Sequence, residues 1–101
     1  MKLIVLYPQP TDSNKFETDY SEHLNLLHSK MNIPQEVKPY TITKFHNTPE
    51  GSPPYYQMFS MPFKSLEELN STLATNEMQE VAADAHRISS GGEPSIMIGE
   101  E

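Results

Sequence analysis

The residue best suited to chemistry is His23, an imidazole among apolar side chains. Between residues 12 and 32 apolar residues recur at steps of four and three, which predicts one helix with a stripe made of Phe16, Tyr20, Leu24, Leu27 and Met31. At about 100° per residue, His23 falls about 20° from Phe16, inside that stripe. Imidazole changes charge near neutral pH, so His23 is a candidate general acid or base. The alternative is a structural histidine whose nitrogens are satisfied by a backbone carbonyl or water.

Asp84 is the second candidate catalytic residue. A later helix is predicted from the stripe Met78, Val81, Ala82, Ala85 and Ile88. Asp84 lies at the edge of that stripe, within about 40° of Ile88. The carboxylate is therefore placed to face His23 across a helix pair and to fix the tautomer of its ring, although a carboxylate at such an edge is more often merely solvated.

Several large side chains are candidates for a substrate-binding pocket. They are Tyr20, Tyr40, Tyr56, Met58 and Phe63. Aromatic and thioether groups of this kind can surround a small organic ligand. Each is equally explained as part of the core or of a subunit interface.

No pattern in the chain predicts a metal or a cofactor. His23 and His28 are five positions apart and so about 140° apart around a helix, which prevents both from binding one ion from that segment. The chain has no cysteine, no glycine-rich phosphate loop and no nucleophile elbow. We therefore expect neither a cofactor nor a metal ion.

The composition indicates one small acidic domain. The chain has 101 residues, of which 36% are hydrophobic, and a formal net charge of -7. The length predicts a single domain over residues 1–101. The negative charge disfavours nucleic acid and anionic membrane as partners. The apolar start ends at Tyr7 and Pro8, which is too short for a signal peptide or a membrane span, so we expect a cytoplasmic protein.

Four strands and three helices should position these residues. Strands are predicted over Lys2–Tyr7, Glu36–His46, Tyr55–Met61 and Ser95–Ile98. The first helix should follow Thr11 or Asp12 and end near Met31, and a short helix should follow Ser65. The last helix should start at Thr75 or Asn76 and run to Ile88, where Ser89–Gly92 supply residues suited to a left-handed cap.

The order β-α-β-β-α-β predicts an α+β, ferredoxin-like sandwich with a four-stranded antiparallel sheet. The first and third strands carry apolar groups on both faces and should be central, while Pro39 places the second strand at an edge. In the third strand Tyr56, Met58 and Ser60 should share the face opposite Tyr55, Gln57, Phe59 and Met61. Because the helices cover only one face, we expect a homodimer through the other.

Four stretches of the chain resemble the EthD-like family of the dimeric α+β barrel superfamily, which is named for a small protein of ether degradation. They are KLIVLYPQP at the start, the Tyr20-x-x-His23-Leu24-x-Leu26 core of the first helix, Met61–Leu69, and Val81–Asp84. In the family a proline commonly follows this histidine in the pattern x-Pro-Leu, and Asn25 stands in its place here. The resemblance implies a site for a small organic molecule and a dimeric α+β barrel, without fixing the chemistry.

Three classes of function remain open. The first is a cofactor-free enzyme of an oxidoreductase or lyase type, acting on a small organic substrate with His23 as acid or base. The second is a non-catalytic accessory or ligand-binding protein of a degradation or biosynthetic pathway. The third is a ligand-sensing regulator, which is disfavoured because no DNA-binding segment accompanies the domain. A closed cavity of about 300 Å³ or more beside His23 would favour the enzyme, and a filled one the accessory protein.

Overall fold

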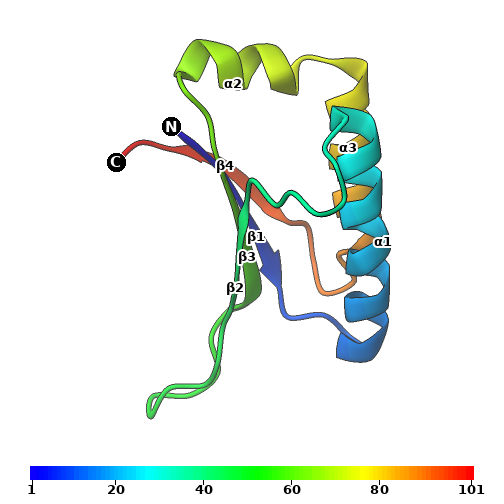
Figure 1. Cartoon of the computed structure of the whole chain (residues 1–101). Coiled ribbons are helices and arrows are strands. Elements are labelled where there is room, and N and C mark those ends of the chain that lie inside the picture. The colour runs from blue at the N-terminus through cyan, green and yellow to red at the C-terminus, as the bar shows by residue number, and fades with distance from the viewer.

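The computed structural model describes residues 1–101 and has an α+β architecture with two layers (Figure 1). The elements in chain order are β1 (Lys2–Pro8), α1 (Ser13–Met31), β2 (Thr41–Lys44), β3 (Tyr55–Pro62), α2 (Leu66–Leu73), α3 (Asn76–Ile88) and β4 (Ser95–Gly99). The strands form one antiparallel sheet in the order β2-β3-β1-β4. The predicted ferredoxin-like fold is confirmed, with β1 and β3 in the middle and β2 at an edge.

Each helix begins at a polar cap that the sequence predicts. The side chains of Asp12, Ser65 and Thr75 accept hydrogen bonds from backbone amides three residues further on, at 3.1, 3.0 and 3.2 Å. These caps satisfy amides that have no partner within the helix. Helix α1 ends at Asn32, which takes a left-handed conformation with φ of 55°.

The second strand is much shorter than predicted. The sequence predicts a strand over Glu36–His46, but only Thr41–Lys44 pair with β3. The preceding residues are instead held at the end of α1 by His28, whose Nδ1 lies 3.1 Å from the carbonyl oxygen of Pro34 and whose Nε2 lies 2.7 Å from the Tyr40 hydroxyl. Pro39, which has no amide hydrogen to donate, therefore lies outside the ladder.

A β-bulge in β3 changes the side on which Tyr56 lies. The register with β1 shifts between Tyr7 and Pro8, so that Tyr7 pairs with Gln57 and Pro8 with Tyr55. Tyr56 then packs edge-on against Phe16 of α1 at 5.4 Å, and its hydroxyl donates to Glu17 at 2.6 Å. Strict alternation, which placed Tyr56 with Met58 on the other face, fails here because a bulge inserts one residue into the strand.

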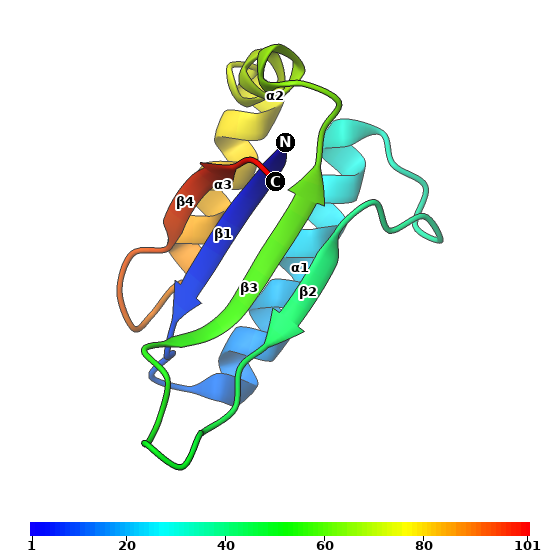
Figure 2. The same ribbon diagram turned by 90° about the vertical axis from the view of Figure 1, so that its left-hand side faces the viewer.

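The core lies between the sheet and the helices. It is formed by alternate residues of β1 and β3, such as Val5 and Phe59, packed against Phe16 and Leu27 of α1 and Val81 of α3. The other face of the sheet has no helix over it (Figure 2). None of the helices combines the length and apolar character that crossing a membrane would require.

Helix α3 ends without the predicted left-handed cap, and the connection after it makes close backbone contact with another part of the chain. The C-cap residue that follows the helix, Ser89, has φ of -91°, outside the left-handed region. In the connection that follows, a Cβ placed on Gly91 would lie 1.7 Å from the carbonyl oxygen of Gln9. The nearby Ser90 hydroxyl accepts a hydrogen bond from the Thr11 amide at 3.0 Å. The α3–β4 connection is thus packed directly onto the β1–α1 connection.

We predict that Gly91→Ala destabilises the fold by about 1–3 kcal/mol. The added methyl group would clash with the backbone carbonyl of Gln9, which cannot move aside as a flexible side chain can. Urea unfolding followed by circular dichroism measures this change. The control is Glu93→Ala in the same connection, whose side chain is exposed and which should cost less than about 0.5 kcal/mol. Equal stability of the two variants would contradict the packing described.

Candidate functional site

His23 and Asp84 are joined by a hydrogen bond across the two long helices. The Nδ1 atom of His23 on α1 lies 2.8 Å from Oδ2 of Asp84 on α3, and Nε of Arg87 donates to Oδ1 of the same carboxylate at 2.7 Å. A carboxylate only accepts, so the proton of the neutral ring is on Nδ1. This leaves Nε2 of His23 as a free hydrogen-bond acceptor.

The protonation states of this pair follow from opposing effects. Burial lowers the pKa of His23 below its ordinary value, and the hydrogen bond from its ring to Asp84 only partly offsets this. Burial alone would raise the pKa of Asp84, but hydrogen bonds from Arg87 and His23 outweigh it, so that this pKa lies below its usual value. At neutral pH the pair is therefore a neutral imidazole beside a carboxylate.

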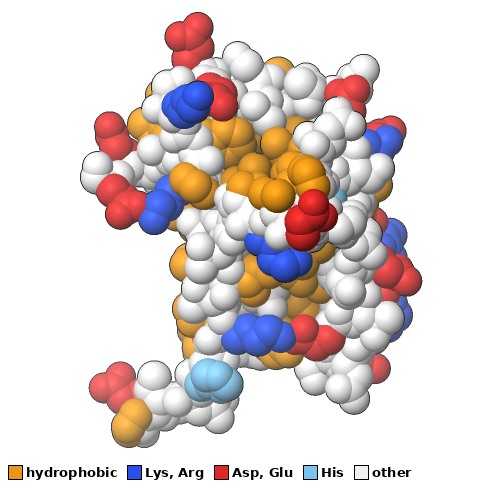
Figure 3. Space-filling view, viewed as in Figure 1, with side chains coloured by type: hydrophobic (Ala, Val, Ile, Leu, Met, Phe, Trp, Pro, Cys, Tyr) orange, Lys and Arg blue, Asp and Glu red, His pale blue; other side chains and the backbone are white.

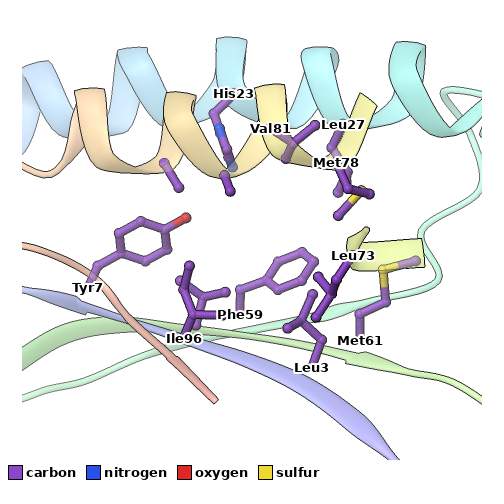
Figure 4. Close-up of a pocket in the computed structure, with 13 residues that line it drawn as sticks. Leu3, Tyr7, His23, Leu27, Phe59, Met61, Leu73, Met78, Val81 and Ile96 are labelled. Atoms are coloured by element: carbon purple, nitrogen blue, oxygen red, sulfur yellow. The ribbon is translucent and has the colours of Figure 1, made fainter. Parts of the chain in front are cut away.

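An apolar cavity of about 50 Å³ lies beside His23, between the helices and the sheet (Figure 4). It is lined by Leu3, Val5, Tyr7, His23, Leu27, Phe59, Met61, Leu73, Met78, Val81, Ala82, Ala85 and Ile96. The His23 ring points from α1 toward the sheet. Its Nε2 atom is thus placed against apolar surface, where a hydrogen bond or proton transfer is not screened by water.

Tyr20, the predicted pocket residue nearest His23, lies beside the cavity but does not line it. Its ring packs between Phe16, at 5.6 Å, and His23, at 5.8 Å. Its buried hydroxyl and the buried side-chain amide of Gln57 both lack a hydrogen-bond partner. Burial raises the pKa of the Tyr20 hydroxyl well above its usual value, and the neighbouring Gln57 amide opposes this only in part.

The other predicted pocket residues lie away from this cavity. The Tyr40 hydroxyl is hydrogen-bonded to His28 and its ring lies tilted against Phe59, with the centroids 5.3 Å apart, while the Tyr56 hydroxyl is hydrogen-bonded to Glu17. Met58 pairs with Leu6 and Thr43 on the uncovered face of the sheet. Phe63 follows β3, where its amide donates to the carbonyl oxygen of Met1 at 2.7 Å. A ligand-binding role for these four residues remains a prediction.

Of the residues that line the cavity, sequence reasoning selected only His23, and the polar one that it missed is Tyr7. It ends the run of apolar residues in β1 and shares the helix-facing side with Leu3 and Val5, which is the only signal that marks it. Its hydroxyl points toward the helices in Figure 4. His23 and Tyr7 together supply the side-chain polar groups of the cavity.

The face of the molecule in Figure 3 carries charges of both signs. Figure 3 shows Lys and Arg side chains interspersed with Asp and Glu on the face seen there, with apolar side chains between the sheet and the helices. No group of three or more His, Asp or Glu side chains is arranged to hold a metal ion.

We predict that the free energy of unfolding falls as the pH drops below about 6.5, the ordinary pKa of histidine. The pKa of His23 is lowered in the fold, so the unfolded chain binds the proton first and acid favours unfolding, while above that pH the contribution is constant. His23→Gln should remove this part of the slope in urea unfolding between about pH 5 and 8. The matched control is His86→Gln at an exposed position of α3, which should keep it. Equal slopes in wild type and His23→Gln would contradict the assignment.

Comparison with solved structures places the chain among known proteins. An ethyl tert-butyl ether D (EthD) family protein from Bacillus halodurans C-125 is 30% identical, with a TM-score of 0.81 over 99% of this chain and 96% of that one. A dimeric ferredoxin-like protein of unknown function from Jannaschia sp. CCS1 is 13% identical, with a TM-score of 0.68 over the same shares of the two chains, and shares the fold. No protein-family model and no curated protein matches the sequence. The likeness to the Bacillus protein spans nearly the full length of both chains, and the chain therefore belongs to the EthD family.

Proposed function

We propose that this protein binds a small organic molecule in the cavity beside His23 and uses His23 as a general acid or base without a cofactor. The observation that carries the proposal is the His23–Asp84 hydrogen bond of 2.8 Å, which leaves Nε2 free beside apolar surface. Membership of the EthD family supports a role with small molecules, in keeping with the ether in the family's name.

The chemistry would consist of proton transfer at Nε2. A neutral imidazole accepts a proton from the bound molecule, and the Asp84 carboxylate stabilises the imidazolium that forms. Asp84 acts through the ring and is therefore a positioning residue, as is Arg87, which holds the second carboxylate oxygen at 2.7 Å. Proton transfer of this kind serves isomerisation, elimination and the first step of cofactor-free oxidation.

The volume of the cavity favours a second candidate, a non-catalytic ligand-binding accessory protein. Typical ligand pockets have volumes of about 300 Å³ or more. The cavity of about 50 Å³ holds only a few non-hydrogen atoms in this conformation. A larger ligand would have to extend past Leu73 and Ile96 or displace side chains. The enzyme would convert a bound compound to product, whereas the accessory protein would bind it without turnover.

We further propose a homodimer formed through the uncovered face of the sheet. Ile4, Leu6 and Met58 are half-buried on that face and Met97 is exposed. Figure 2 shows that no helix covers this face. Four apolar side chains in adjacent strands form the kind of patch that a partner covers. The patch carries no charge, so two copies can meet there without repulsion. Contact through the acidic surface elsewhere would bring negative charges together.

For the ligand site, we predict that His23→Gln lowers turnover by about 100-fold or more with little change in melting temperature. Glutamine keeps bulk and hydrogen bonding but cannot titrate. Until a substrate is found, affinities for compounds recovered from a thermal-shift screen provide the measurement, with His86→Gln as the control. Wild-type affinity of His23→Gln for every such compound, across the pH range in which imidazole titrates, would remove His23 from the site.

For the assembly, light scattering at micromolar concentration should give about twice the chain mass of 11.5 kDa. Met58→Lys should shift the population to monomer, since the interface would bury an unpaired charge. Asn70→Lys, on the exposed side of α2, adds the same charge outside the interface and should leave the dimer intact. A wild-type chain that remains monomeric at high micromolar concentration would rule out this dimer.

A further inference from the structure

Tyr7 places a hydroxyl group in the wall of the cavity opposite His23. The residue belongs to the central strand β1, pairs with Gln57 of β3 and is only 1% exposed. Its hydroxyl makes no hydrogen bond within the chain and is directed from the sheet toward the helices (Figure 4). A buried hydroxyl that faces a cavity rather than packed atoms is available to a ligand.

The Tyr20 ring packs against both Tyr7 and His23. Its centroid lies 5.5 Å from that of the Tyr7 ring and 5.8 Å from that of the His23 ring. Tyr7 approaches the Tyr20 ring from strand β1, and His23 approaches it from helix α1. The two free polar groups of the cavity are brought together on either side of one small volume.

The two groups have complementary hydrogen-bonding roles. Burial, and to a smaller extent the charge of Asp84, raises the pKa of Tyr7 well above its usual value, so its hydroxyl keeps its proton and can donate. The Nε2 atom of His23 can only accept, because the ring proton is on Nδ1. A ligand that satisfies both must accept at one atom and give up a proton at a neighbouring one.

We propose that Tyr7 is a second catalytic residue, which donates a hydrogen bond to a carbonyl oxygen while Nε2 of His23 takes a proton from the adjacent carbon. This inference rests on the proposed function and deepens it by naming the substrate class. The substrate is a small neutral ketone or aldehyde with a hydrogen on the carbon next to the carbonyl. The rest of the molecule contacts the apolar lining.

The step is balanced without any further reactant. The C–H bond breaks and its proton forms the Nε2–H bond of an imidazolium that Asp84 stabilises. The electron pair of the C–H bond forms a carbon–carbon double bond, and the carbonyl oxygen becomes an enolate oxygen held by the Tyr7 hydroxyl. Return of a proton from Nε2 to carbon restores the ketone, either in place or after exchange with solvent.

The charges near the cavity favour a neutral ligand over an anion. No Lys or Arg is among the lining residues, and the nearest ionised group is the carboxylate of Asp84. The basic group close to it, Arg87, is already bonded to that carboxylate. A carboxylate ligand would enter apolar surroundings without a counter-ion, which is costly.

The test uses two probes of the same shape, cyclopentanone and methylenecyclopentane, which differ in having an oxygen or a methylene group at the double bond. Protein-detected NMR titration measures the affinity of each for wild type, Tyr7→Phe, His23→Gln and the control Tyr55→Phe, which changes a tyrosine outside the cavity. In D₂O, loss of the ketone α-proton signal measures proton abstraction. We expect wild type to bind the ketone more tightly than the hydrocarbon and to accelerate its exchange.

In Tyr7→Phe, affinity for the ketone should fall about 10-fold and exchange roughly 100-fold, while hydrocarbon affinity and the Tyr55→Phe values stay unchanged. His23→Gln should lose exchange and should weaken ketone binding measurably, but by less than Tyr7→Phe does. Equal binding of both probes to wild type would overturn the role of Tyr7 and leave the proposed function standing, whether or not Tyr7→Phe folds. Unchanged ketone binding and exchange in Tyr7→Phe would also overturn the role of Tyr7 and leave the proposed function standing. Failure of both probes to bind would overturn the proposed function and this inference together.

Discussion

The packing of α1 and α3 side by side on β1 and β3 is the interaction on which the rest of the structure depends. The apolar stripes of the two helices cannot be buried against each other alone, and the helix-facing side chains of the central strands complete one core. The same packing brings His23 and Asp84, 61 positions apart in the chain, to 2.8 Å. Fold and candidate site therefore share one cause.

Placing a polar pair in this interface is a compromise between desolvation and hydrogen bonding. His23 is 5% exposed, and its lowered pKa shows that burial dominates over the favourable carboxylate. Asp84 remains closer to solvent, where Arg87 completes its hydrogen bonding. The His23 imidazole therefore stays neutral and is held in one orientation, and its Nε2 atom can accept a hydrogen bond from another group. A purely structural histidine looks different, and His28 provides the example, since both of its nitrogens are engaged by the chain.

The two faces of the sheet have different physical requirements. On the helix side, small residues of α3 such as Ala82 and Ala85 leave a cavity over β1 that the side chains around it do not fill. On the other side, half-buried apolar residues such as Ile4 and Leu6 have no covering layer in one chain. The fold thus has a small unfilled space on the helix side of the sheet and an uncovered apolar patch on the other side.

The sequence by itself determined the element order, the N-terminal caps of the helices and the two helix stripes, because these depend on local periodicity and on side chains a few positions apart. Through the stripes it also indicated that His23 is buried, but it left open whether Asp84 faces that ring or solvent, and the tertiary structure places the two 2.8 Å apart. Resemblance to the EthD family, visible in the opening strand and the first helix, is confirmed by the structural relative.

Only the tertiary structure decided which aromatic groups meet the cavity. The bulge in β3 places Tyr56 against α1, and the hydrogen bond to His28 places Tyr40 at the end of that helix. Tyr7, from β1, is the tyrosine that lines the cavity. A bulge and a long-range hydrogen bond follow from how separate elements pack, which no local spacing encodes. The size of the cavity depends on the same packing, since it is the space that side chains from all three helices and three strands fail to fill.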